Sequence, residues 1–163
     1  MTNSPHLWER LSLPSERLWL GQGSGSWPND KSVADAAALR QKAKRVVIVE
    51  DEMFVALHLE TVLQDLGLEV CQIVATGGAA VEASREYEPD IIFMDINLRG
   101  DIDGVEAARR IRQAYNTPII FVTAYGDEAM LKRVNAVAPG ASIIQKPPMT
   151  AALVAAISKA IGN

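Results

Sequence analysis

Short runs of large apolar residues recur from about residue 46 onward, and several of them end abruptly on a polar residue. The clearest run is Ile91-Ile92-Phe93-Met94, which follows Asp90 and ends on Asp95. Such a run is too short for a helix, and its bulk is typical of a strand that is covered on both faces, as in a parallel sheet. Similar runs predict strands over residues 46–49, 68–74, 90–94, 118–122 and 141–145.

Amphipathic segments separate these runs and predict helices. The first covers 55–66 and ends at Gly67, with an apolar face made by Val55, Leu59, Val62, Leu63 and Leu66. Comparable segments follow over 77–87, 104–115, 128–138 and 151–161. Asp127 and Thr150 are expected to cap the last two, and Ile161 to lie on the inner face of the final helix. Because each helix follows its strand, the pattern predicts an α/β fold with a parallel sheet, right-handed crossovers and helices on both faces.

The ends of the predicted strands carry the residues with chemistry. Glu50-Asp51 follow the first strand, Asp95 the third, Thr123 the fourth and Lys146 the fifth. In open parallel sheets the carboxyl ends of the strands form the crevice in which ligands bind. We therefore expect acids, a hydroxyl and an amine to meet at one edge of the sheet.

Composition and charge narrow the function. The chain has 163 residues, 48% hydrophobic and 22% charged, which is typical of one globular core with an appendage. No apolar run approaches the roughly 18 to 20 residues that span a bilayer, and no signal peptide is evident, so a cytoplasmic protein without membrane insertion is expected. Residues 46–163 hold nine Lys/Arg against sixteen Asp/Glu. This acidic body argues against nucleic acid as a direct partner and suits a divalent cation.

Residues 1–44 are expected to form a separate N-terminal extension, followed by a domain over 45–163. Pro, Gly and Ser residues predict a flexible linker around 21–31, and an Ala-rich stretch predicts a short helix over 32–44. The extension carries Trp8, Trp19 and Trp27. These aromatic residues fit either an interface or a disordered tail, and the sequence does not choose between them.

Taken together, the strand-end residues Glu50-Asp51, Asp95, Thr123 and Lys146 resemble those of the receiver domain of two-component response regulators, over roughly residues 45–162. The resemblance implies a flavodoxin-like, doubly wound five-stranded sheet of order 2-1-3-4-5. It also implies that Asp95 is the phosphoacceptor, whose carboxylate attacks phosphorus to form an acyl phosphate.

The resemblance further implies a magnesium site, in which Mn²⁺ could replace Mg²⁺. Asp51, Asp95 and the backbone carbonyl of Asn97 would bind the cation, and Glu50 would act through a coordinated water. Without the cation, at least one carboxyl pKa in this crowded group is expected to rise. Thr123 would donate to a phosphoryl oxygen and Lys146 would offset its charge, with a cis peptide bond before Pro147.

The same resemblance implies a partner and an output. A sensor histidine kinase or a histidine phosphotransfer protein would supply the phosphoryl group, so that the protein is a phosphoacceptor rather than an enzyme. Because only Gly162-Asn163 follow the last predicted helix, a stand-alone regulator is expected. Its output would be contact with a downstream protein target or drainage of phosphoryl groups from a shared kinase, and a homodimer is compatible with the family.

Some positions depart from the common receiver pattern. The loop 96–104 lacks the usual proline and is one residue longer, and its Asp101 and Asp103 are expected to shape the turn or to assist the metal. Ile143 stands where many receivers carry an aromatic switch residue. By contrast, 121–126 is similar to the Phe-Ala-Thr-Gly-Tyr-Gly stretch of a subfamily of stand-alone receivers, which makes Tyr125 and Gly126 the switch candidates.

Two alternative functions remain open from the sequence. A haloacid-dehalogenase-type phosphatase also uses a strand-end Asp, but it needs a second Asp where this chain has Asn97. A pseudo-receiver would be a binding module that is never phosphorylated, and the intact acidic set argues against it.

Overall fold

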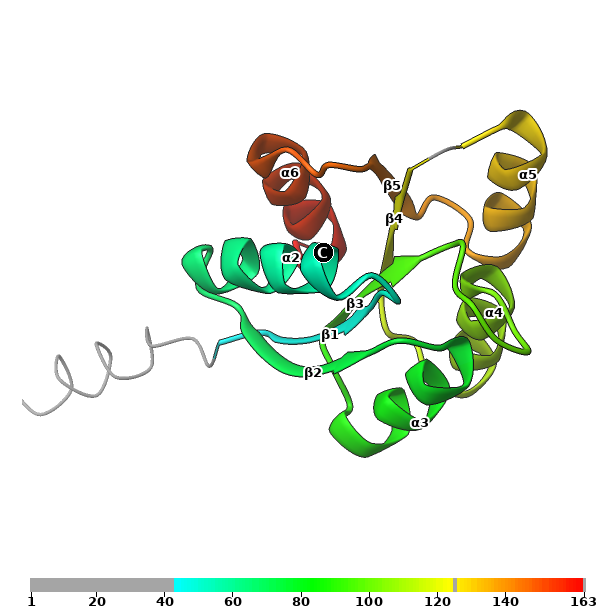
Figure 1. Ribbon diagram of the computed structural model, residues 1–163, viewed down its shortest axis with the longest axis horizontal. Coiled ribbons are helices and arrows are strands. Elements are labelled where there is room, and N and C mark those ends of the chain that lie inside the picture. The colour runs from blue at the N-terminus through cyan, green and yellow to red at the C-terminus, as the bar shows by residue number, and fades with distance from the viewer. Residues whose placement is uncertain (1–42, 125, 163) are drawn as a thin grey trace, which may run out of the picture. The chain divides into compact units, whose positions relative to one another are not determined.

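The computed structural model describes residues 43–124 and 126–162, which belong to one compact unit over 42–163 (Figure 1). Strands and helices alternate along it: β1 (Arg45–Val49), α2 (Met53–Asp65), β2 (Glu69–Val74), α3 (Gly77–Tyr87), β3 (Ile91–Asp95), α4 (Gly104–Ala114), β4 (Ile119–Thr123), α5 (Glu128–Val137), β5 (Ser142–Gln145) and α6 (Thr150–Ile161). Within this part of the chain no helix has the length and apolar character that crossing a bilayer requires.

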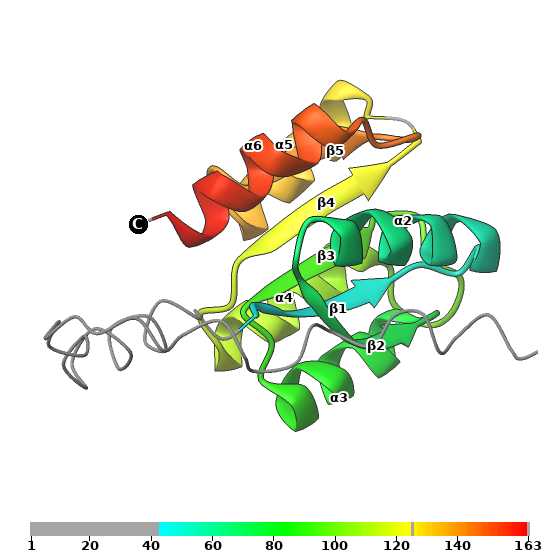
Figure 2. The same ribbon diagram turned by 90° about the vertical axis from the view of Figure 1, so that its left-hand side faces the viewer.

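The five strands form one parallel sheet in the order β2-β1-β3-β4-β5, which confirms the predicted fold (Figure 2). Val49 of β1 lies beside Met94 of β3, and Asp95 lies beside Val122 of β4. In the sheet β2 lies on one side of β1, and β3 lies on the other side. The strand order therefore reverses between β1 and β3, which is where ligands bind in open α/β sheets.

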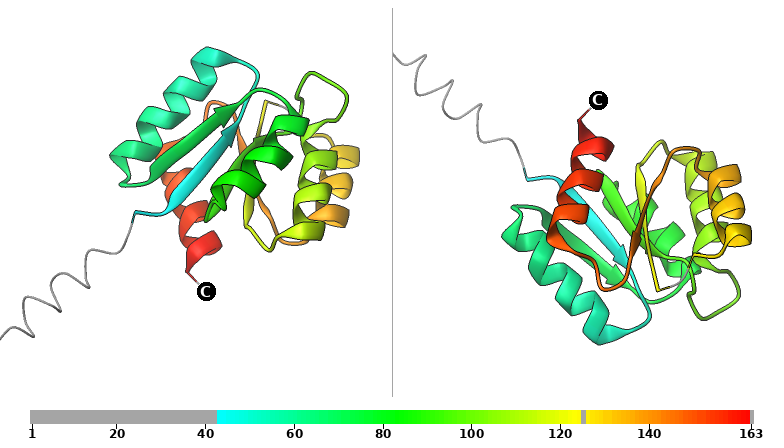
Figure 3. Two further views of the ribbon diagram at one scale, coloured as in Figure 1. Left: turned by 90° about the horizontal axis from the view of Figure 1, so that it is seen from below. Right: turned by 90° about the horizontal axis from the view of Figure 1, so that it is seen from above.

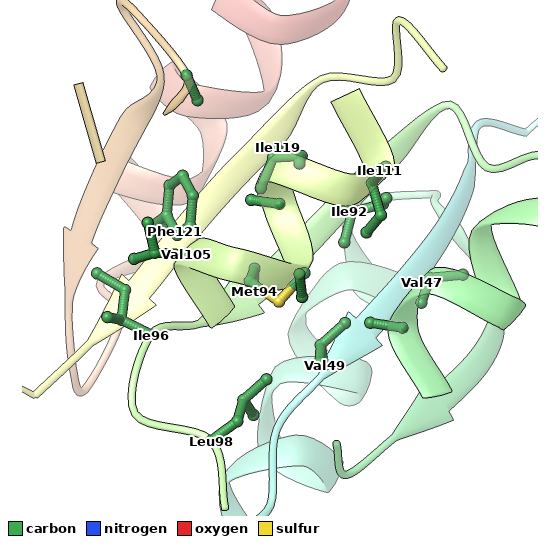
Figure 4. Close-up of a cluster of buried hydrophobic side chains, with 14 of the residues drawn as sticks. Val47, Val49, Ile92, Met94, Ile96, Leu98, Val105, Ile111, Ile119 and Phe121 are labelled. Carbon is green, nitrogen blue, oxygen red and sulfur yellow. The ribbon is translucent and has the colours of Figure 1, made fainter. Parts of the chain in front are cut away.

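Helices cover both faces of the sheet. Figure 3 shows α2 and α6 on one face and α3, α4 and α5 on the other. In Figure 4, Val105 and Ile111 of α4 pack over the strand residues Ile92, Met94 and Phe121, all of which are buried. Each fully buried side chain of this size contributes about 1.5–3 kcal/mol. Because both faces are covered, the central strands consist of consecutive apolar residues without alternation.

Side chains cap the N-termini of three of the described helices, α3, α4 and α5. Asp127 caps α5 as predicted, with its carboxylate accepting a hydrogen bond from the Met130 N–H. The predicted cap at Thr150 is wrong, because Met149 occupies the capping position and Thr150 is already helical. Ile161 was expected inside but is 39% exposed, and it is the last residue of α6.

The buried face of α2 also differs from the prediction. The structure buries Ala56, Leu59 and Leu63, while Val55 is only half-buried and Leu66 lies beyond the last helical residue. Ala56 belongs to the buried cluster that joins α2 to the sheet, and Val55 does not. Of the predicted helix over 32–44, only Ala43 and Lys44 are described, and neither is helical; the rest of it, and Tyr125, lie outside the described residues.

Candidate functional site

The carboxyl ends of four strands deliver the predicted site residues to one edge of the sheet. Asp95 is the last residue of β3 and Thr123 the last of β4, while Glu50 and Lys146 come directly after β1 and β5. Thr123 pairs in register with Gln145, and the Lys146 N–H donates to the carbonyl oxygen of Thr123 at 2.9 Å. The strand register thus fixes the positions from which these side chains extend.

Glu50, Asp51 and Asp95 form an acidic cluster, in which one carboxylate oxygen from each residue lies within 4.8 Å of the others. Only 4% of Glu50 and 5% of Asp95 are exposed. Octahedral magnesium, with metal–oxygen distances of about 2.0–2.1 Å, needs ligand oxygens roughly 3–4 Å apart. The three carboxylates therefore fit a hard divalent cation after small side-chain adjustments.

Lys146 lies between two of these acids. Its ammonium nitrogen is 2.5 Å from Oε2 of Glu50 and 2.7 Å from Oδ2 of Asp95. Burial alone would lower the pKa of Lys146, but the hydrogen bonds to Asp95 and Glu50 outweigh this effect and hold the pKa above its usual value. The lysine is therefore a fixed positive charge against the Asp95 carboxylate. The peptide bond that follows it, to Pro147, is cis as predicted.

Burial and neighbouring charge both act on Glu50. Burial raises the pKa of Glu50 above its usual value, the negative charge of Asp95 adds to the increase, and the hydrogen bond from Lys146 offsets part of it. This direction agrees with the repulsion expected in a crowded group of acids. That a carboxyl pKa rises when the cation is removed stays a prediction. Two backbone N–H groups orient the cluster: Glu52 donates to Oε1 of Glu50 and Asn97 donates to Oδ1 of Asp95, both at 3.2 Å.

The loop after Asp95 returns close to the strand end. The Gly104 N–H donates to the Ile96 carbonyl at 3.0 Å, and a Cβ on Gly104 would collide with the carbonyl oxygen of Asp95. Only glycine allows this approach. The start of α4 thus holds the backbone of Asp95 in place.

A comparison with known proteins settles the family. The family model of the response regulator receiver domain matches residues 46–158. The chain belongs to the response regulator receiver domain family. The chemotaxis protein CheY of Thermotoga maritima is 35% identical over 118 residues, which cover 71% of this chain and 96% of CheY.

Other relatives carry the receiver as one part of a longer protein. A protein-glutamate methylesterase/protein-glutamine glutaminase of Natronomonas pharaonis is 33% identical over 102 residues, which are 63% of this chain and only 28% of that protein. Among solved structures, the signal receiver domain of a modulated diguanylate cyclase from Desulfovibrio desulfuricans G20 is similar, with a TM-score of 0.69 and 36% identity. The matched region covers 74% of this chain and 94% of the chain in that solved structure. The similarity therefore concerns the receiver domain itself.

Two acids of the receiver loop, Asp101 and Asp103, lie outside the acidic cluster among the described residues. Asp103 caps α4 by accepting from the Glu106 N–H at 2.9 Å, and it pairs with Arg133 of α5 at 2.6 Å. Burial raises the pKa of Asp103, but these two hydrogen bonds outweigh it and leave the pKa below its usual value. Of the two predicted roles, the structure supports shaping the turn for Asp103.

One residue of the site was missed from the sequence. Arg99, in the loop after Asp95, forms an ion pair with Asp51, with its Nε 2.9 Å from Oδ2. The only indication in the sequence is that Arg99 lies four residues after Asp95. Neither hydrophobic periodicity nor a place at a strand end indicates that Arg99 belongs to the site. Asn97 is exposed.

Gly126 is also exposed, and a Cβ built on it would lie 3.7 Å from the Leu131 side chain, which is an ordinary contact distance. Nothing described around Gly126 therefore requires a glycine.

Proposed function

We propose that this receiver domain is the phosphoacceptor of a two-component system, and that Asp95 takes a phosphoryl group from a phosphohistidine. The donor is a sensor histidine kinase or a histidine phosphotransfer protein. One observation carries the proposal: a nearly buried Asp95 carboxylate at a strand end shares a cation-sized space with Glu50 and Asp51 and is paired with Lys146.

The reaction is a single group transfer. An oxygen of the Asp95 carboxylate forms a bond to phosphorus while the phosphorus–nitrogen bond to the donor histidine breaks. The imidazole keeps the electron pair and is protonated, and the product is an acyl phosphate. Receiver domains act as phosphoacceptors rather than as turnover enzymes, and hydrolysis of the acyl phosphate would at most be slow.

The acid cluster would hold the cofactor. When bound, Mg²⁺ or Mn²⁺ would neutralise the crowded acids and the equatorial oxygens of the transferring phosphoryl group. Asp51, Asp95 and the backbone carbonyl of Asn97 are the proposed ligands, and Glu50 acts through water. The N–H groups of Glu52 and Asn97 orient two of the carboxylates for this role.

Thr123 and Lys146 are proposed to recognise the added phosphoryl group. Lys146 already contacts Asp95, so its charge needs little movement to offset the roughly −2 charge that phosphorylation brings. Thr123 is buried at the end of β4, where its hydroxyl can donate to a phosphoryl oxygen. The segment 125–148, with Tyr125 and Gly126 as switch candidates, then shifts its preferred packing.

The output is proposed to pass through protein contacts, either with a downstream target or as a sink for phosphoryl groups, and it is compatible with a homodimer. We place the receiver over 45–163 and a distinct extension over 1–44. Direct binding to nucleic acid is not proposed, because the receiver body is acidic. A cytoplasmic location follows from the proposed kinase partner.

Intact-mass spectrometry tests the proposal. The full chain is incubated with acetyl phosphate, and separately with a phosphorylated histidine phosphotransfer protein, in Mg²⁺ or in EDTA. We expect the wild type to gain one hydroxylamine-sensitive phosphoryl group in Mg²⁺ only, and Asp95→Asn, checked for folding by circular dichroism, to gain none. A wild type that no donor labels would instead be a pseudo-receiver, which overturns the proposal.

A further inference from the structure

Arg99 reaches back from the loop between β3 and α4 to the acid cluster. Its Nε lies 2.9 Å from Oδ2 of Asp51 in an ion pair, although the arginine side chain is 87% exposed and that of Asp51 only 12%. An exposed cation is thus paired with a nearly buried acid of the cluster.

The residues on either side of Arg99 fix the position of its side chain. Leu98, on one side of Arg99, is buried and points into the hydrophobic cluster (Figure 4). Gly100, on the other side, has a φ of +122°, a backbone conformation that side-chain-bearing residues rarely adopt. The anchored leucine and the turn at the glycine fix where Arg99 leaves the backbone.

The charges of the three acids explain why Arg99 pairs with Asp51. Three carboxylates converge at the site, and among the described residues Lys146 forms ion pairs with Glu50 and Asp95 but none with Asp51. Arg99 supplies the missing counter-charge to Asp51. Each of the three acids therefore has a cationic partner, and repulsion among them is reduced when no metal is bound.

We propose that Arg99 is an internal counter-ion that competes with the divalent cation for Asp51, so that cation binding requires the arginine to swing out into solvent. The inference rests on the proposed function, because it takes Asp51 as a metal ligand. Lys146 does not leave in the same way, since it is largely buried and contacts two acids. Arg99 can leave, because an ion pair with so exposed a partner is weak. The arginine thereby sets the cation affinity and links the position of loop 96–103 to metal binding.

The test measures Mg²⁺ affinity directly on the full chain, by two-dimensional NMR titration of the backbone amides of Glu52 and Asn97, which donate to cluster carboxylates. We expect Arg99→Ala to bind Mg²⁺ about two- to fivefold more tightly than the wild type. Arg85→Ala is the matched control. It removes the same charge from an exposed pair with Glu82 on α3, outside the site, and should leave the affinity unchanged.

A second measurement needs no substitution. The Nε–Hε resonance of Arg99 in the wild type should move toward the position of a free arginine as Mg²⁺ is added, with the same midpoint as the amide shifts. An Arg99→Ala affinity equal to or weaker than that of the wild type, or an unmoved Arg99 resonance at saturation, would overturn the counter-ion role while leaving the metal site in place. If Mg²⁺ shifts no site amide even in the wild type, the proposed metal site itself fails.

Discussion

Replacing Lys146 by methionine probes the electrostatic core of the site. The substitution keeps a similar volume and removes the positive charge that lies 2.5 Å from Glu50 and 2.7 Å from Asp95. Both carboxylates are almost fully buried, so water cannot replace the lost partner. The variant therefore leaves two like charges side by side in a poorly solvated space.

Removing one partner of a buried pair costs about 3–5 kcal/mol of unfolding free energy. We expect a smaller loss near neutral pH, about 2–3 kcal/mol, because Glu50 can bind a proton and so relieve part of the repulsion. Burial already raises the pKa of Glu50, and the hydrogen bond from Lys146 now opposes that rise. Without the lysine, the pKa of Glu50 rises further.

The upward shift of the Glu50 pKa determines how the stability of the protein depends on pH. A carboxyl group whose pKa is raised by folding binds its proton more tightly in the folded than in the unfolded state, so stability falls as the pH increases through the window between the two pKa values. Lys146→Met widens that window upward. Its loss of stability should therefore be smaller at pH 5 than at pH 7. Mg²⁺ at pH 7 should recover part of it by binding to the folded cluster.

Urea unfolding followed by circular dichroism, in EDTA at pH 5 and pH 7 and then in Mg²⁺, measures these differences. Lys132→Met is the control, because Lys132 forms an exposed pair with Glu128 on α5 and its removal should change stability by less than about 0.5 kcal/mol. A Lys146→Met loss below about 1 kcal/mol, or one that is equal at both pH values and insensitive to Mg²⁺, would refute the reasoning.

Further predictions concern the loop after Asp95. Asp103→Ala should lower the unfolding free energy by about 1–2 kcal/mol in urea titrations, since it removes the α4 cap as well as the pair with Arg133, whereas Asp103→Asn should keep most of the cap. Because folding lowers the pKa of Asp103, the wild-type advantage over Asp103→Asn should be present at neutral pH, begin to shrink as the pH falls below about 4, and be lost once the pH is below the lowered pKa of the folded state. An advantage that stays constant through this range would count against a role of the Asp103 charge. Gly104→Ala should displace the Asp95 backbone and reduce both stability and phosphorylation by acetyl phosphate, while Gly78→Ala, with open space around its Cβ, should retain both. Equal behaviour of the two glycine variants would contradict the close approach.

The fold and the gathering of the acids followed from local pattern plus one rule of topology. Apolar runs such as the one ending on Asp95 marked the strands, and parallel strands place their carboxyl ends on a shared edge. The helix faces were harder to predict. In α2 the apolar residues are spread around the helix, so that spacing alone did not show that Ala56, rather than Val55, would face the sheet.

The parts of the site that escaped prediction depend on loop conformation and long-range pairing. Arg99 meets Asp51 only because Leu98 and Gly100 fix the loop, and Arg133 meets Asp103 because α5 packs beside α4. Neither pair has a sequence spacing that indicates contact. The phosphate-switch candidates at Tyr125 and Gly126 rest on the resemblance to the subfamily and stay a prediction.

The central claim is that one carboxylate, that of Asp95, accepts the phosphoryl group. Borohydride reduction of the phosphorylated protein converts a phosphorylated aspartate to homoserine, and peptide mass spectrometry then locates the converted residue. The account predicts homoserine at position 95 alone, formed only when Mg²⁺ is present during phosphorylation. Homoserine at position 51, or a phosphorylated protein without homoserine at 95, would contradict it.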